Sequence, residues 1–129
     1  RIYPTDNPHD LQDCDLIIEA VYENLEIKAK VTKEAYPHLA KKGVFASNTS
    51  TLPITLLAEA ANNSENYIGI HFFSPVEKMK LIEIIVVKKT SKETIAKAFD
   101  FAQQIHKTPI IVNDSRGFFT SRVFGTYVD

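Results

Sequence analysis

The sequence predicts an α/β fold with a largely parallel sheet, and two observations support this. Short apolar runs, typical of strands that are buried on both faces, recur between longer segments whose apolar residues have helical spacing. These strands and helices alternate along the chain, which is the order that builds a parallel sheet with helices on its faces. The predicted strands are residues 15–21, 44–46, 67–71, 81–87 and 108–112.

The first predicted helix covers residues 25–42. Asn24 is a good N-cap for it, and an apolar residue occupies every fourth position from Ile27 onward. Its last turn is basic and is followed by Gly43, a common way for a helix to end.

The other predicted helices follow the same rules. Pro53 can open a helix that ends at the polar tract 62–66, and Ser91 can cap a helix that runs to Ile105. The sequence becomes helical again from residue 118 onward.

One connection breaks the alternation of strands and helices. Only residues 72–80, with Pro75 among them, separate the third predicted strand from the fourth. A parallel crossover needs about a dozen residues or more. We therefore expect these two strands to be antiparallel, or not to be neighbours.

Charge and composition narrow the classes of partner. The chain has 129 residues, 15 of them basic and 16 acidic, and its net charge of −1 predicts no surface for nucleic acid or for an anionic membrane. No apolar run approaches the roughly 18 residues of a membrane-spanning helix. Cys14 is the only cysteine, which fits a reducing compartment, so we expect a cytoplasmic location or a reducing organelle. The histidines and the cysteine do not have metal-ligand spacing, so no metal is expected.

Polar segments follow the predicted strands at 19–24, 47–51 and 71–75. In open α/β sheets the ligand lies beyond the carboxyl ends of the strands. We therefore expect the functional side chains to lie in these three segments.

Glu83 is the only charged residue in the predicted strand 81–87. A buried carboxylate is costly unless it is paired, and His71 is the nearest partner in sequence. A carboxylate beside an imidazole fixes the tautomer of the ring and raises its basicity, which suits a general base. The alternative is that Glu83 lies on a solvated face of the sheet and that His71 merely ends a strand.

Ser50 and Lys28 each have a structural and a functional interpretation. Serine is common in turns because it bonds nearby backbone, but the Ser50 hydroxyl could also point at a ligand. Lys28 is either a solvated helix residue or a contact for an anion or a ribose near the start of the helix. The sequence contains no G-x-G-x-x-G and no G-x-x-x-x-G-K, so these residues alone do not establish a dinucleotide site.

At these residues the chain resembles the 3-hydroxyacyl-CoA dehydrogenase family. The resemblance runs from about residue 15 to the end, with Ser50 and His71 separated by 21 residues and His71 and Glu83 by 12, as in the family. The stretches that carry it are 15–24, 45–50, 71–76, 79–83 and 113–119.

The resemblance implies NAD-dependent oxidation of an L-3-hydroxyacyl-CoA to the 3-ketoacyl-CoA on a partial Rossmann-like, doubly wound, mainly parallel sheet. His71 would be the catalytic base, Glu83 would orient it, and Ser50 would bond the substrate oxygen and lie against the nicotinamide. The remaining expected contacts are Val21, Tyr22, Glu23, Lys28 and Ser74 for NAD, and Ser121 for the substrate. Ser74 and Ser121 depart from the asparagines usual in the family, and this variant resembles bacterial multifunctional β-oxidation subunits.

The resemblance also implies a division of the chain. Residues 1–113 would be the later portion of the NAD-binding domain, without its Gly-rich unit, and residues 114–129 would begin a helical C-terminal domain. We therefore expect the chain alone to bind NAD weakly and to be inactive or slow. A sheet without its first strands would expose an edge, which makes a homo-oligomer an expected form.

Two other classes of function fit part of the sequence. Ser50, His71 and Glu83 contain the residue types of a Ser-His-Glu hydrolase triad, although Ser50 lacks a G-x-S-x-G elbow. The chain could also be a non-catalytic α/β assembly module, in which case replacing His71 by alanine would leave the activity of the protein unchanged.

Overall fold

The computed structural model describes residues 1–62, 64–115 and 117–128. Asn63, in the polar tract predicted to end a helix, and Arg116 and Asp129, in the predicted second domain, lie outside the described residues. The strands are β1 (Cys14–Glu19), β2 (Leu39–Ser47), β3 (Tyr67–Phe72), β4 (Leu81–Val86) and β5 (Thr108–Asn113). The helices are α1 (Leu25–Ala35), α2 (Ile54–Ala58), α3 (Lys92–Gln104) and α4 (Thr120–Val128), with single 3-10 turns at Pro8–Leu11, Tyr36–His38 and Glu59–Ala61.

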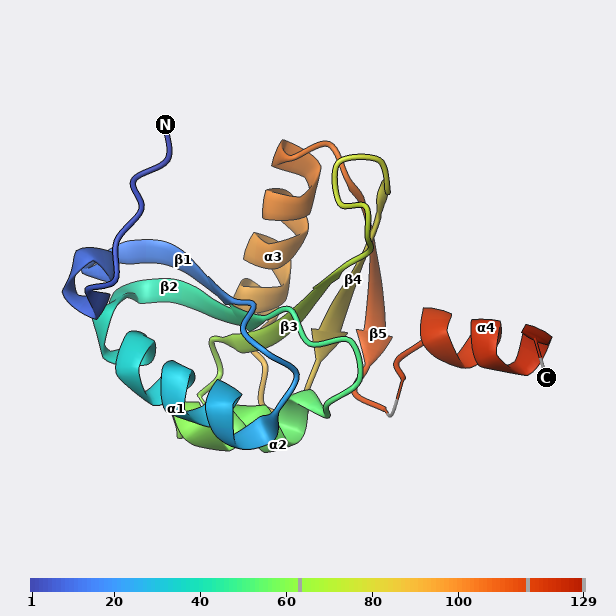
Figure 1. Cartoon of the computed structure of the whole chain (residues 1–129), viewed down its shortest axis with the longest axis horizontal. Helices are drawn as coiled ribbons and strands as arrows, with labels where there is room; N and C mark the ends of the chain where they lie inside the picture. Colours follow the sequence, from blue (N-terminus) through green and yellow to red (C-terminus); the bar gives the residue numbers. More distant parts are fainter. Residues whose placement is uncertain (63, 116, 129) are drawn as a thin grey trace.

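The described strands form one sheet in the order β1-β2-β3-β4-β5 (Figure 1). β1, β2 and β3 run parallel, β3 and β4 are antiparallel, and β4 and β5 are again parallel. The antiparallel pair expected from the short connection is confirmed. The arrangement is the mainly parallel, Rossmann-like sheet that the resemblance implied, and it brings the carboxyl ends of β1, β2 and β3 to one edge.

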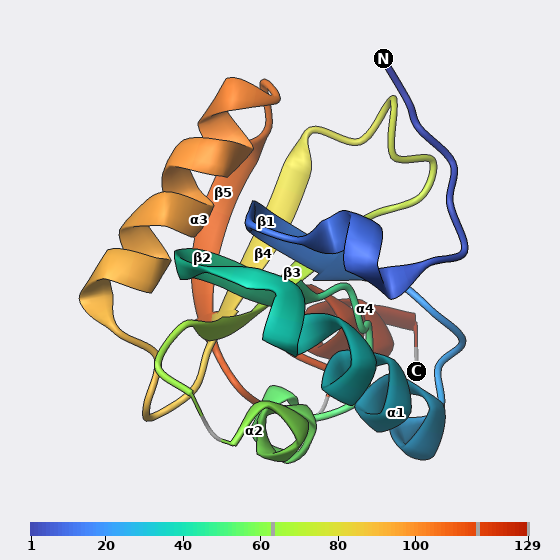
Figure 2. The ribbon, with the colours of Figure 1, turned by 90° about the vertical axis from the view of Figure 1, so that its left-hand side faces the viewer.

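Helices cover both faces of the sheet, with α1 and α2 on one face and α3 on the other (Figure 2). Alternate residues of a strand enter opposite cores, so that Phe45 packs beneath α1 and α2 while its neighbour Val44 packs against α3. On the first face, a Cβ on Gly69 would lie only 2.7 Å from Cδ1 of Ile54. The missing side chain therefore lets α2 begin directly against the strand that carries His71.

The predicted helix over 25–42 is wrong in its last part. α1 ends at Ala35, a 3-10 turn follows at Tyr36–His38, and residues 39–42 belong to β2. The reason is Pro37, which lacks an amide hydrogen and whose ring clashes with the carbonyl four residues before it.

α4 projects from the body of the domain (Figure 1). It is preceded by Gly117, whose φ of +76° favours glycine, and by Phe118, whose side chain is buried in the core beneath α1 and α2. Beyond this anchor, α4 exposes the large apolar side chains of Val123, Phe124 and Tyr127. None of the helices in the described residues has the length and hydrophobicity that crossing a bilayer requires.

Candidate functional site

His71 and Glu83 face each other across the antiparallel strands β3 and β4. Nδ1 of His71 lies 3.0 Å from Oε2 of Glu83, and the two residues are only 7% and 0% exposed. The pairing expected from the sequence is therefore present. A neutral imidazole that donates from Nδ1 to a carboxylate has an unprotonated Nε2, so the ring can accept a proton at that atom.

Aromatic rings hold the imidazole in place. The ring of Phe73 lies 4.5 Å from that of His71, between centroids, and the ring of Phe118 lies 6.0 Å away. Apolar surroundings strengthen the hydrogen bond between His71 and Glu83, because water competes less for either partner.

The second oxygen of Glu83 is also bonded. Oε1 accepts a hydrogen bond from the backbone N–H of Thr120, 2.8 Å away, and another from the Thr120 hydroxyl. Thr120 is the first residue of α4, so the carboxylate lies at the positive end of a helix dipole. The full burial of Glu83 is thus compensated at both oxygens.

A second buried network forms where β1 ends. Oε1 of Glu19 lies 2.8 Å from Nζ of Lys28 and accepts a hydrogen bond from the backbone N–H of Val21. Oε2 of Glu19 accepts a hydrogen bond of 2.6 Å from the Ser47 hydroxyl. Lys28 is only 1% exposed and also donates to the carbonyl of Val21, so its interpretation as a solvated lysine is wrong. The cause is Glu19, a buried carboxylate that needs a partner.

Glu23 connects the loop after β1 to the loop after β2. Its carboxylate accepts hydrogen bonds from the Thr49 hydroxyl at 2.6 Å, and from the backbone N–H and the hydroxyl of Ser50. Burial opposes the ionised form of Glu23. The hydrogen bonds from Thr49 and Ser50 and the charge of Lys28 outweigh burial and hold the pKa of Glu23 below its ordinary value.

Ser50 does not complete a hydrolase triad in this structure. Its hydroxyl lies 3.0 Å from Oε2 of Glu23, and no hydrogen bond joins it to His71 within the described residues. A nucleophilic serine must bond its base, so the hydrolase interpretation loses its central contact.

The other predicted contacts lie at the surface. Val21 and Tyr22 are 38% and 78% exposed, between the Glu19 network and Glu23. Ser74 is exposed in the β3–β4 connection, and Ser121 is exposed in the first turn of α4.

Three side chains that organise the site were not singled out as individual residues from the sequence, although Glu19 and Asn48 lie in the polar segments predicted to carry function. Asn48 accepts a hydrogen bond from the backbone N–H of Phe72, the residue after His71, and thereby joins the ends of β2 and β3. Glu19 carries the same signal that identified Glu83, a lone carboxylate inside an apolar run. For Thr120, the only feature in the sequence that could have indicated its role is its position at the start of a predicted helix.

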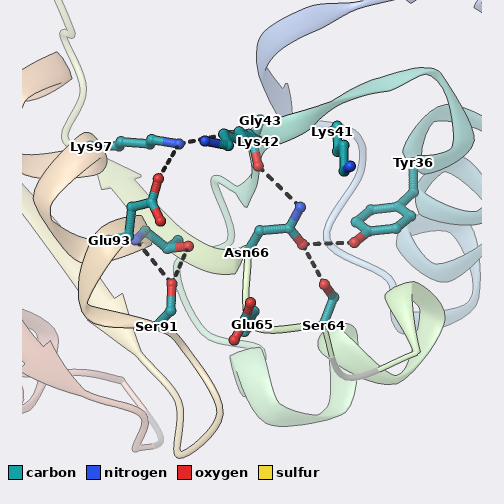
Figure 3. A pocket seen from close by; sticks show the side chains of 11 residues that line it. Tyr36, Lys41, Lys42, Gly43, Ser64, Glu65, Asn66, Ser91, Glu93 and Lys97 are labelled. Atoms are coloured by element: carbon teal, nitrogen blue, oxygen red, sulfur yellow. Dashed lines mark hydrogen bonds and ion pairs between the residues drawn. The ribbon is translucent and has the colours of Figure 1, made fainter.

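A pocket of about 380 Å³ lies elsewhere, at the amino ends of β3 and α3 (Figure 3). Its polar groups bond one another: Asn66 accepts a hydrogen bond from Tyr36, and Lys97 pairs with Glu93. The first contact joins the 3-10 turn Tyr36–His38 to the segment before β3, and the second lies within α3. The residues that line the pocket include no histidine. The carboxyl edge with His71 is therefore the better candidate site.

Comparison with known proteins gives a consistent result. The family model described as "3-hydroxyacyl-CoA dehydrogenase, NAD binding domain" matches residues 1–115. The fatty acid oxidation complex subunit alpha of Shewanella halifaxensis is 47% identical over 119 residues, which is 92% of this chain and 17% of that protein. The chain thus spans 17% of the length of this curated relative.

Solved structures share the fold. The (S)-3-hydroxybutyryl-CoA dehydrogenase PaaH1 of Ralstonia eutropha superimposes with a TM-score of 0.91 at 35% identity, over 96% of this chain and 44% of that one. FadB2 of M. tuberculosis also superimposes with a TM-score of 0.91, at 31% identity and with the same coverage of both chains.

Proposed function

Because the chain belongs to the family of 3-hydroxyacyl-CoA dehydrogenase NAD-binding domains, we propose that the protein carrying it oxidises an L-3-hydroxyacyl-CoA to the 3-ketoacyl-CoA. When bound, NAD would supply the acceptor for the hydride from C3 of the substrate. The buried pair of His71 and Glu83, at 3.0 Å, is the observation that carries this proposal. It provides a proton acceptor beside the edge of the sheet where α/β folds bind their ligands.

In this proposal His71 is the catalytic base. Its Nε2 accepts the proton of the substrate 3-hydroxyl group, and Glu83 keeps the ring in the required orientation through Nδ1. The negative charge of Glu83 then stabilises the imidazolium that forms. Ser50 bonds the substrate oxygen, for which its hydroxyl must turn away from Glu23.

The loops at this edge fit one part of a dinucleotide. Val21 and Tyr22 expose apolar surface against which a flat ring can lie, and the ionised carboxylate of Glu23 can accept hydrogen bonds from ribose hydroxyls. Because the sequence has no glycine-rich phosphate loop, these residues suit the nicotinamide and its ribose better than the pyrophosphate. Lys28 is buried beneath this surface, and its ammonium group supports the loop by donating a hydrogen bond to the carbonyl of Val21.

Ser74 completes the cofactor contacts in this proposal, and Ser121 contacts the acyl-CoA substrate. We assign residues 1–113 to the NAD-binding domain and residues 114–129 to the start of the next domain. The relative from Shewanella halifaxensis is named as a subunit of a complex. We also propose that the present protein assembles, either as a homo-oligomer or within a complex. Its proposed location is the cytoplasm.

The test is the rate of NADH formation from L-3-hydroxybutyryl-CoA by the protein that carries this chain. Replacing His71 by alanine should lower kcat about 10²–10⁴-fold, the usual contribution of a general base. Glu83→Gln should cause a smaller loss. His38→Ala is the control, because His38 is a partly buried histidine that also bonds through Nδ1, to Gln12. A His71→Ala variant that keeps the parent rate would leave the resemblance as one of fold alone.

A further inference from the structure

We propose that Thr120 is a positioning residue for the His71–Glu83 pair and that it couples helix α4 to the catalytic base. This inference rests on the proposed function, because it concerns the base assigned there. Thr120 offers two donors to one atom: its backbone N–H, 2.8 Å from Oε1 of Glu83, and its hydroxyl.

Glu83 needs both of its oxygens held if it is to orient His71. Oε2 lies 3.0 Å from Nδ1 of His71, and Oε1 bonds only to Thr120 within the described residues. A carboxylate that is bonded at one oxygen alone can swing about its terminal torsion, and a buried unpaired oxygen loses its solvation. The two donors of Thr120 remove both problems, so they fix the direction from which Glu83 meets the imidazole.

The same contact fixes the start of α4. The first N–H groups of a helix have no partner within the helix, and a carboxylate at this end is stabilised by the helix dipole. Glu83, 37 residues before Thr120 in sequence, supplies this acceptor from the neighbouring strand β4. The interaction is therefore mutual, since α4 stabilises the ionised Glu83 while Glu83 anchors α4.

The segment before α4 touches the other member of the pair. The buried ring of Phe118 lies 6.0 Å from that of His71, between centroids. Residues 118–120 thus contact both His71 and Glu83. Ser121, the proposed substrate contact, follows directly, so its position relative to the base depends on the same anchor.

The test compares kcat and KM in variants of Thr120. Thr120→Val keeps the shape and the backbone N–H but removes the hydroxyl, and we expect kcat to fall about tenfold, the size expected for a hydrogen bond to a charged group. KM for NAD and for the acyl-CoA should not change, because the backbone N–H of residue 120 still bonds Glu83 and keeps the start of α4 and Ser121 in place. Thr120→Ser, which restores the hydroxyl, should restore most of kcat.

Thr126→Val is the matched control. Thr126 lies on the same helix, but its hydroxyl donates to the helix backbone, to the carbonyls of Arg122 and Val123. This variant should keep the parent kcat. If Thr120→Val does not fold, Thr120→Ala replaces it, with the same expected results.

A second measurement does not depend on turnover. In the cofactor-free protein, the Nδ1 proton of His71, observed by NMR, should exchange with water faster in Thr120→Val than in the parent or in Thr126→Val. Equal exchange in all three proteins, or a Thr120→Val variant with the parent kcat while His71→Ala is inactive, overturns the role of Thr120 and leaves the proposed function standing. A His71→Ala variant with the parent rate overturns both.

Discussion

Glu23 is the residue at this edge whose ionisation the structure controls most clearly. It is partly exposed, yet hydrogen bonds from Thr49 and Ser50 and the charge of Lys28 favour its carboxylate. Ionised Glu23 therefore stabilises the folded protein by joining the loops that follow β1 and β2, in addition to its proposed contact with the cofactor.

This gives a prediction for pH. A group whose pKa is lower in the folded than in the unfolded state stabilises the fold above its unfolded pKa, and this contribution is lost as pH falls through the folded pKa. Urea unfolding should therefore show the parent to be more stable than Glu23→Gln at pH 7. The difference should shrink as pH falls below about 4.3, the ordinary pKa of glutamate. Glu77→Gln, at an exposed position in the β3–β4 connection, should show no such trend, and a Glu23 difference that grows on acidification would contradict the account.

The contacts of single residues were predictable from the sequence only in part. The pair of His71 and Glu83 could be predicted, because a lone carboxylate in an apolar strand needs a partner and a histidine lies across a short loop. Thr120 and Asn48 could not, since their partners lie 37 and 24 residues away in sequence. From the sequence, Lys28 could be either a solvated helix residue or a contact for a ligand. Its burial depends on the buried carboxylate of Glu19, and the sequence alone did not establish that Glu19 is buried.

At the scale of elements, chain geometry was a better guide than apolar spacing. The connection 73–80 is too short for a parallel crossover, and β3 and β4 are indeed antiparallel. The spacing of apolar residues from Ile27 to Leu39 suggested one long helix, but Pro37 ends α1 early and the chain enters β2. The proline was the stronger signal because it removes a hydrogen bond and adds a clash.

Helix α2 gives a prediction at this scale. Its N-cap residue, Pro53, makes no side-chain capping bond, and Asp114 supplies the acceptor instead, bonding the backbone N–H groups of Ile54 and Thr55 at 3.0 and 2.8 Å. Asp114→Ala should lower the free energy of unfolding by about 1 kcal/mol, the usual effect of removing a helix cap. Asp100→Ala, at an exposed position on α3, serves as the control in urea unfolding. Equal stability of the two variants would show that Asp114 does not cap α2.

In the whole molecule, the proposed site is assembled from segments far apart in sequence. The loops after β1 and β2, the antiparallel strands β3 and β4, and the start of α4 all contribute to it. The fold class followed from the order of elements, whereas the family followed from the order and spacing of motifs. The geometry adds how Thr120 holds the carboxylate of Glu83, which no motif specifies.

The most direct test of the central claim follows the hydrogen at C3 of the substrate. The protein that carries this chain is given NAD and L-3-hydroxybutyryl-CoA with deuterium at C3, and the products are analysed by mass spectrometry. The account predicts that deuterium appears in the reduced nicotinamide, and that His71→Ala slows this transfer. Release of free CoA with the label still in the acid would contradict it, because thioester hydrolysis would then be the reaction.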